Sequence, residues 1–153
     1  RVVLLKGIKE DGLVFYTNYE GAKAQAMAHH PKVSLTFFWA ELERQVQVKG
    51  TSEKLNTEES LAYFHSRPRG SQIGAWASPQ SQVIDSRTFI EERVKELEEK
   101  YENQEIPLPP HWGGYLVKVQ EMEFWQGRPS RLHDRIVYRS QEAGQWIRQR
   151  LAP

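Results

Sequence analysis

Residues 131–135, with the sequence RLHDR, form the densest set of potential anion-binding groups in the chain. In a β-strand alternate side chains share a face, so Arg131, His133 and Arg135 are expected to project together. Asp134 would lie on the opposite face, where it neutralises the other three poorly. Cations gathered on one face repel one another unless an anion lies among them. The pattern predicts either an anion-binding strand face or a solvated one, and spacing alone leaves both open.

Tyr63, Arg67 and Ser71 follow one another at intervals of four residues. Tyr63 and Arg67 would share one face of a helix that Pro68 ends. A short helix can restart over residues 69–76, which places Ser71 near a helix N-terminus, where free N–H groups favour an anion. A phenol, a guanidinium, a hydroxyl and open amides together indicate a phosphate pocket. Helix capping with surface pairing is the alternative interpretation.

A third group lies where a strand gives way to a helix. Tyr16-Thr17-Asn18 is followed by Gly21 and Lys23. Thr17 and Lys23 would flank a helix N-terminus, which is a natural phosphate site. Such junctions are common, so this signal is weak when taken alone.

The chain offers no evident nucleophile or metal-ligand set. Cysteine is absent, which excludes thiolate chemistry and disulfides. The five histidines lack ligand spacing with a third donor, so no metal site is expected. Neither a Ser-His-Asp order nor a nucleophile elbow is present. Groups that hold phosphates without a nucleophile favour an enzyme whose cofactor carries the chemistry.

Composition bounds the class of protein. The chain has 153 residues, 39% of them hydrophobic, which favours one compact domain. A net charge of +1 argues against a nucleic-acid or membrane partner, although a β-barrel nucleic-acid binder using Arg131, Arg135 and Trp125 is conceivable. No apolar run reaches the roughly 18–20 residues of a membrane span, and no basic leader opens the chain. A soluble, cytoplasmic protein is expected.

Hydrophobic patterning predicts a mainly β fold with helical insertions, an α+β class. A strand covered on both faces is expected at residues 2–5, joined through Asp11-Gly12 to a second at 13–17. Further strands and helices follow from alternation, capping residues and prolines. The strands are expected at 33–38, 45–48, 115–125, 131–138 and 146–151, and the helices at 21–30, 57–67, 69–76 and 86–101. A β-barrel is predicted, because closure removes exposed edges.

Several segments together resemble the pyridoxine/pyridoxamine 5'-phosphate oxidase family. They include RVVLLK (1–6), VFYTN (14–18), YFHSRPRGSQIGAW (63–76), PLPPHWGGY (107–115) and EFWQG (123–127) followed by RLHDR. The resemblance implies a homodimer of split β-barrels that bind flavin mononucleotide (FMN) in the dimer interface. Members carry a further helix and strand upstream, so residues 1–153 are expected to form one split-barrel domain without them.

The resemblance also implies a reaction. Pyridoxine 5'-phosphate and pyridoxamine 5'-phosphate would be oxidised to pyridoxal 5'-phosphate by transfer of a hydride equivalent from C4' to flavin N5. Oxygen would then reoxidise the flavin and give hydrogen peroxide, with ammonia released from the amine substrate. A non-catalytic split-barrel flavin-binding protein is the alternative.

The family's binding residues carry over position by position. FMN would be held by Arg1, Val2, Val3, Leu4, Leu5, Lys6, Tyr16, Thr17, Ala22, Lys23, Gln45, Gln80, Ser81, Trp125 and Arg135. The substrate would be held by Lys6, Tyr63, Arg67, Ser71, Arg131, Leu132 and His133. Arg131 and His133 would be the catalytic pair, orienting the pyridine ring and stabilising charge, with no general-base role assigned to His133.

Ala22 departs from the family pattern, which has an arginine on the flavin phosphate at this position. Loss of one charge-assisted contact is expected to weaken FMN binding by about tenfold or more unless another cation takes its place.

Overall fold

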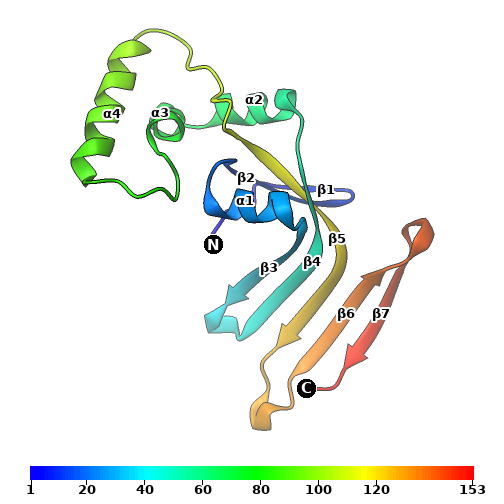
Figure 1. The fold of residues 1–153 in the computed structure, drawn as a ribbon. Coiled ribbons are helices and arrows are strands. Elements are labelled where there is room, and N and C mark those ends of the chain that lie inside the picture. Colours follow the sequence, from blue (N-terminus) through cyan, green and yellow to red (C-terminus); the bar gives the residue numbers. More distant parts are fainter.

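A single seven-stranded antiparallel sheet runs through the protein, with most of the helices gathered at one end (Figure 1). The computed structural model describes residues 1–153, apart from the side chain of Ala143. The strands are β1 (Gly7–Lys9), β2 (Gly12–Asn18), β3 (Lys32–Trp39), β4 (Arg44–Lys54), β5 (Trp112–Gln126), β6 (Asp134–Ser140) and β7 (Trp146–Leu151). The helices are α1 (Ala22–His29), α2 (Thr57–Ser66), α3 (Arg69–Ala77) and α4 (Arg87–Lys100), and short 3₁₀ turns cover Ala40–Leu42, Pro129–Arg131 and Glu142–Gly144.

Strand β5 organises the sheet because it pairs with three others. Its first half pairs with β2 and its second half with β6, while β4 runs along the opposite edge. The register between β4 and β5 shifts at Lys49/Gly50, and a Cβ added at Gly50 would overlap the carbonyl oxygen of Lys118. Such an irregularity bends and twists a strand, and the sheet curls accordingly.

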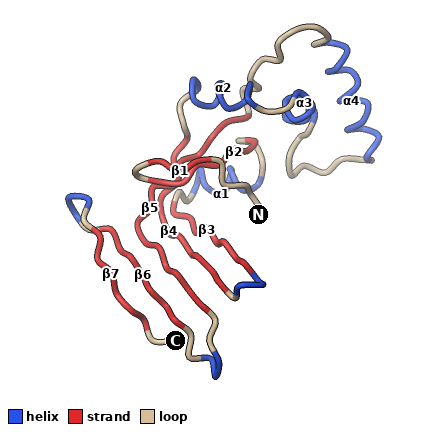
Figure 2. The backbone as a smooth tube through the Cα atoms, turned by 180° about the vertical axis from the view of Figure 1, so that it is seen from behind, coloured by secondary structure: helices blue, strands red, loops and turns tan.

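The curled sheet does not close on itself within one protomer. Strands β3 and β7 each pair with a single neighbour, so the sheet is a half-barrel. Strands β3, β4, β5, β6 and β7 lie side by side in it (Figure 2). The predicted mainly β class is confirmed, whereas the expected removal of both edges is not achieved inside one chain.

Helices α2, α3 and α4 form a separate apolar core at the start of β5. Asn56 caps α2 through Glu59 N–H at 2.7 Å, and Ser86 caps α4. Side chains from all three helices and from Trp112 fill the space between them. The buried members are Phe64, Ile73, Ala77, Leu97, Tyr101, Ile106 and Trp112. This core fixes the ends of α2 and α3 against the sheet.

Helix α1 covers a second core on the sheet itself. Ala24 packs with Phe15, Tyr115 and Val117, and Met27 packs against the same group. The small alanine lets the helix lie close to β2 and β5. The N-terminus of α1 is thereby held beside the end of β2.

The predicted helices and most strands are confirmed, but two strand predictions are wrong. Residues 1–6 form no strand, and pairing with β2 starts where the main-chain N–H of Lys6 donates to Val14 O at 2.8 Å. Val2 and Leu4 are 96% and 66% exposed, because one protomer offers them no covering layer. Strand β6 begins only at Asp134, because Ser130 and Arg131 take positive φ values of 59° and 63°.

Within the described residues, no helix is both long enough and apolar enough to cross a membrane.

Candidate functional site

Lys23 is the centre of a small polar cluster between β2, α1 and the loop after α3. Its Nζ donates to Thr17 Oγ1 and to Gln80 Oε1, both at 2.6 Å. Thr17 is buried, and Lys23 is half-buried in the first turn of α1. Burial, together with nearby Arg1, lowers the pKa of the Lys23 ammonium. Two cations held close without a counter-charge make a site ready for an anion.

Arg67 is the second cation of this region. It follows α2 directly, where Pro68 ends the helix, and its Nη1 is buried with no hydrogen-bond partner among the described residues. Burial lowers the pKa of its guanidinium, although an arginine stays charged at any ordinary pH. A buried charged donor without a partner is costly, so this group also fits an anionic ligand.

A hollow of about 230 Å³ lies beside Arg67, and Gln80 links it to the Lys23 cluster. It is lined by Asn18, Arg67, Ser71, Gly74, Ala75, Ser78, Gln80 and Trp112. Gln80 therefore touches the Lys23 cluster and also faces the hollow of Arg67. Ser71 lies in the first turn of α3, as its spacing predicts. The structure thus brings together the predicted residues Thr17, Lys23, Arg67, Ser71 and Gln80.

Three aromatic rings stack at the inner wall of this region. Tyr16 lies on Tyr63 with ring centroids 3.8 Å apart, and the Trp112 ring is 5.5 Å from Tyr16 and 6.2 Å from Tyr63, all nearly parallel. Burial, and next the carboxylate of Glu59, raises the pKa of the Tyr16 phenol, which keeps it a neutral hydrogen-bond donor. Opposite Tyr16 on β5, Gly114 has no side chain, and a Cβ there would collide with the tyrosine ring.

The N-terminal segment borders a different hollow, also of about 230 Å³. Arg1, Val2, Val3 and Leu5 face residues of β2 and β3 across it. Leu4 and Lys6 are exposed, as is Ala22 at the start of α1. Ser81 is exposed and has a φ of 72°. Two of these segments lie near the Lys23 cluster: Arg1 affects the pKa of Lys23, and Ser81 directly follows Gln80, which accepts a hydrogen bond from Lys23.

Gln45, Trp125 and Arg135 form a row across three adjacent strands at the far end of the sheet. Gln45 is opposite Trp125, and Trp125 is opposite Arg135, so the three side chains share one face. The Arg135 guanidinium makes two hydrogen bonds to Glu123, at 2.7 and 3.0 Å, and these raise its pKa. Unlike Lys23 and Arg67, this cation already has a carboxylate partner.

His133 lies at the same end of the sheet, but it precedes β6 and is not part of the strand whose alternation was predicted. Its ring packs on Trp125 with centroids 4.8 Å apart, and its Nδ1 accepts the Arg128 main-chain N–H at 3.2 Å. A neutral His133 with Nδ1 as acceptor carries its proton on Nε2 and offers a donor there. Arg131 and Leu132 are exposed in the turn before β6, Leu132 by 68%.

The two groups of predicted residues are far apart in one protomer. Thr17 is opposite Gly113 near the start of β5, whereas Trp125 lies near its end. From Gly113 to Trp125 the strand covers a path of roughly 40 Å at the rise of an extended chain. One flavin cannot bridge that path, so a single protomer does not assemble the whole predicted site.

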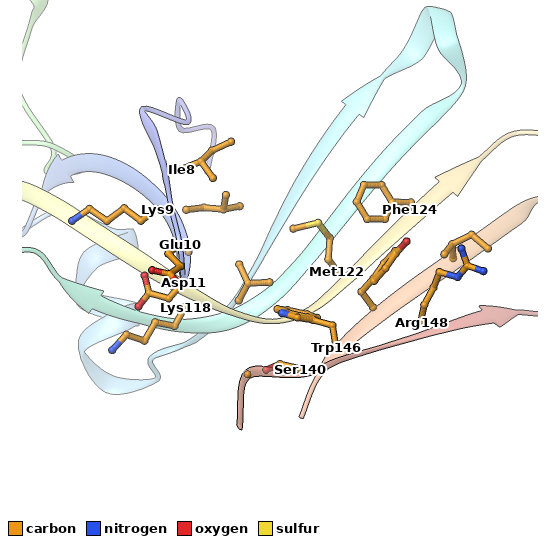
Figure 3. Close-up of a pocket in the computed structure, with 16 residues that line it drawn as sticks. Ile8, Lys9, Glu10, Asp11, Lys118, Met122, Phe124, Ser140, Trp146 and Arg148 are labelled. Atoms are coloured by element: carbon orange, nitrogen blue, oxygen red, sulfur yellow. The ribbon is translucent and has the colours of Figure 1, made fainter. Parts of the chain in front are cut away.

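The most spacious hollow described contains none of the predicted residues. It has a volume of about 970 Å³ and lies between the β1–β2 turn and the β5–β7 sheet. Met122, Phe124 and Trp146 point into it, with Lys118 and Arg148 at its ends (Figure 3). Its lining is mostly apolar, and most of it comes from residues 118–148.

Sequence reasoning missed two residues that complete these groups. Trp112 lines the hollow of Arg67 and Ser71, together with Asn18 from the predicted group at the end of β2, and Glu123 neutralises Arg135. The available signal for Trp112 was its position, as a large aromatic residue directly before Gly113-Gly114. Glu123 gave no local signal, because its partner is on another strand.

Solved structures share this fold. PhzG from Burkholderia lata 383, in complex with tetrahydrophenazine-1-carboxylic acid, matches with a TM-score of 0.91 and 26% identity over 100% of this chain and 74% of that chain. A pyridoxamine 5'-phosphate oxidase-related, FMN-binding protein from Nostoc punctiforme shares the fold with a TM-score of 0.76 and 16% identity, over 100% and 80% of the two chains. The half-barrel and its cation sites define a split-barrel protein of the class that binds FMN.

Sequence relatives narrow the class to one family. Residues 1–101 match the family described as pyridoxamine 5'-phosphate oxidase, and residues 112–153 match the pyridoxine 5'-phosphate oxidase C-terminal dimerisation region. Pyridoxine/pyridoxamine 5'-phosphate oxidases from Synechocystis sp. and Salinibacter ruber are 59% and 56% identical over all of this chain, which covers 71% and 72% of those proteins. The chain belongs to the pyridoxamine 5'-phosphate oxidase family.

Family membership confirms the resemblance and three expectations that followed from it. The protein is an oxidoreductase, its cofactor is FMN, and it forms a homodimer through the C-terminal region. The alternative of a non-catalytic flavin-binding protein is not favoured. The individual binding residues remain predictions, supported by the geometry described above.

Proposed function

We propose that the protein oxidises pyridoxine 5'-phosphate and pyridoxamine 5'-phosphate to pyridoxal 5'-phosphate with O₂ as electron acceptor. The observation that carries this proposal is the pair of half-buried cations, Lys23 and Arg67, neither of which is ion-paired to a carboxylate among the described residues. Two separate phosphoesters, one on the cofactor and one on the substrate, need two such cations.

Lys23 fits the cofactor phosphate. It lies in the first turn of α1, where main-chain N–H groups and the helix dipole also favour a phosphate. Thr17 and Gln80 orient its ammonium, and Arg1 lies close enough to add a second charge. Arg1 can therefore supply the positive charge that Ala22 lacks. The proposed cofactor set is completed by residues 2–6, Tyr16 and Ser81 on this side and by Gln45, Trp125 and Arg135 on the other.

Arg67 fits the substrate phosphate. Its free donors face a hollow that also contains Ser71, at the N-terminal turn of α3. Tyr63 lies on Tyr16, so the proposed substrate site would directly adjoin the proposed cofactor site. Lys6 from the N-terminal segment would complete the set. A phosphate held at this depth orients the rest of the substrate toward the flavin.

The pyridine ring would be held by the partner protomer. Arg131, Leu132 and His133 lie at the far end of the sheet with Gln45, Trp125 and Arg135, too far along β5 to meet Arg67 of the same chain. In the two-fold dimer that we propose, the far end of one protomer would lie against Lys23 and Arg67 of the other. His133 Nε2–H and the Arg131 guanidinium would then donate hydrogen bonds to the substrate ring and stabilise negative charge on it.

The cofactor supplies the two-electron redox chemistry, with O₂ as the final acceptor that leaves as hydrogen peroxide. The alcohol substrate loses two hydrogens to give the aldehyde directly. The amine substrate also consumes one water and releases ammonia. The residues of this chain would bind and orient the cofactor and the substrate and exclude bulk water.

We infer that residues 1–153 act as a single domain in which the partner covers the large apolar hollow. Strand β5, in the dimerisation region, pairs with β2 and β4 from the other matched region. Exposed Phe124 and Trp146 lie in the hollow, and most of its lining belongs to residues 112–153. Contact there would also bring the two halves of the site together.

A spectrum and an oxygen electrode test the proposed function. The purified dimer with FMN should absorb visible light as a flavoprotein and consume oxygen when pyridoxine 5'-phosphate or pyridoxamine 5'-phosphate is added. Equal yields of hydrogen peroxide and pyridoxal 5'-phosphate are expected. A flavin-loaded dimer that consumes no oxygen with either compound would rule the proposal out.

A further inference from the structure

The Arg67 guanidinium is held by aromatic faces and not by hydrogen bonds. Its central carbon lies 4.6 Å from the centroid of Trp112 and 5.8 Å from that of Phe64. No acceptor for its side chain is found among the described residues, and Nη1 is buried without a partner. The position of the guanidinium is therefore set by stacking, which leaves its N–H donors free.

We propose that Trp112 is a positioning residue that presents Arg67 to the phosphate of the substrate. The inference rests on the proposed function, and it assigns a task to a residue outside the predicted binding set. Trp112 lines the same hollow as Arg67 and Ser71, so its indole forms the floor on which the guanidinium lies.

Trp112 is itself rigidly placed. It is 7% exposed and begins β5, and its main-chain N–H donates to Pro109 O at 3.1 Å. Its ring runs parallel to Tyr63, at 5° between planes, and meets the edge of Phe64 at a centroid distance of 5.4 Å. A guanidinium stacked on so constrained a ring loses little further freedom when a ligand binds.

An aromatic support suits a phosphate site better than a carboxylate would. A carboxylate within ion-pairing distance would fix the arginine, but it would neutralise the charge and occupy the donors that the phosphate needs. Arg135 shows that contrast in the same chain, because Glu123 occupies two of its N–H groups. The face of Trp112 holds Arg67 while leaving its charge and its donors available.

Trp112 also belongs to the helical core, so a purely structural role has to be separated from positioning. Trp112→Leu keeps apolar bulk but removes the aromatic face, and Trp112→Phe keeps a smaller face. Trp76→Leu is the matched control: Trp76 packs against the same core, but its Nε1 donates to Pro107 O and it makes no cation–π contact with Arg67.

The test compares pyridoxamine 5'-phosphate with unphosphorylated pyridoxamine in the FMN-loaded dimer. Trp112→Leu should raise the KM for the phosphorylated substrate by about tenfold, with kcat/KM for pyridoxamine and the Kd for FMN nearly unchanged. Trp112→Phe should recover most of that loss. Trp76→Leu should lower thermal stability without changing the preference for the phosphorylated substrate.

Two results would overturn the inference. One is a Trp112→Leu enzyme that loses the same factor with both substrates, and the other is a Trp112→Phe enzyme no better than Trp112→Leu. Should Trp112→Leu not fold, Trp112→Phe alone must still show a rise of about threefold confined to the phosphorylated substrate. A wild-type protein that oxidises neither compound would instead overturn the proposed function, which separates the two failures.

Discussion

Lys23 and Arg67 differ in what holds them, and we propose that each binds its own ligand. Lys23 donates to a hydroxyl and an amide at the start of α1, whereas Arg67 rests on an indole beside Ser71. Gln80 contacts the first cation and also lines the hollow of the second. The two anion sites are thus neighbours with separate supports, and single substitutions should separate them.

Arg67→Ala is expected to weaken the substrate far more than the cofactor. Removal of a charge-assisted phosphate contact costs about 1.5–3 kcal/mol, which corresponds to about ten- to a hundredfold in affinity. Lys23→Ala is the matched variant and should show the reverse pattern. FMN affinity by fluorescence quenching and KM for pyridoxamine 5'-phosphate measure the two effects. Equal losses of both ligands in either variant would show that the two phosphate sites have been confused.

The affinity for FMN should fall as pH rises through the Lys23 pKa, which burial and Arg1 hold below the ordinary lysine value. Only the ammonium form attracts the phosphate, so the loss occurs on the alkaline side. Above about pH 7.5 the phosphate itself is already a dianion. Lys23→Arg, which stays charged, should flatten the decline in a titration of FMN Kd against pH. An identical decline in both proteins would assign the effect to another group.

Sequence alone predicted which residues the structure brings together around Lys23 and Arg67, because the signals there are local. The four-residue spacing of Tyr63, Arg67 and Ser71 and the junction at Thr17 and Lys23 are each set within one or two turns of chain. At the other end the strand alternation predicted for Arg131, His133 and Arg135 is wrong, because β6 begins only at Asp134. Positive φ values at Ser130 and Arg131 end the alternation, and nothing in the residue types announced them.

At the scale of elements, β5 determines which residues can meet. It carries Trp112 at one end and Trp125 at the other, and opposite Lys49/Gly50 of β4 it contains a bulge of one extra residue, Gln120. The bulge lets β4 follow the curl of β5 without losing pairing on either side. Gly50 is buried at the closest approach of the two strands.

Gly50→Ala should destabilise the fold by about 1–3 kcal/mol, because the added methyl overlaps the Lys118 carbonyl and forces the strands apart. Gly70→Ala is the control, since a Cβ at that position in α3 meets open space. It should be neutral or stabilising by up to about 1 kcal/mol. Urea unfolding of both variants measures the difference. A Gly50→Ala protein as stable as Gly70→Ala would contradict this role of the bulge.

Most elements were predictable from capping residues, prolines and alternation, as with Asn56 before α2 and Ser86 before α4. Residues 2–5 were not, because an apolar run indicates burial without saying by which chain. Val2 and Leu4 are exposed in one protomer. The continuous strand expected at 115–125 is confirmed as part of β5, whereas its pairing with three strands was not predicted, since that depends on contacts remote in sequence.

At the scale of the molecule, we propose that a second copy binds where apolar surface is exposed. Phe124 and Trp146 are 42% and 46% exposed in the hollow between the β1–β2 turn and the C-terminal strands. The homodimer forms through residues 112–153, and a half-barrel with open edges gains stability when a partner covers its apolar face.

Trp146→Glu should dissociate the dimer and release FMN, because a carboxylate in a covered apolar hollow is costly to desolvate. Phe89→Glu is the control: Phe89 is 44% exposed on α4, outside the dimerisation region. Sedimentation velocity and flavin content are the readouts. If Trp146→Glu stays dimeric and yellow, the hollow is not the surface that the partner covers.

The most direct test of a site shared between two protomers is complementation. Lys23→Ala and Arg131→Ala change opposite ends of the sheet, and each variant alone should be nearly inactive. Co-expressed, they form mixed dimers in which one site receives Lys23 from one chain and Arg131 from the other. Roughly a quarter of the wild-type oxidase activity should return, as a two-fold dimer with random pairing requires. Mixed dimers, purified through two different tags, that remain as inactive as either parent would contradict the account.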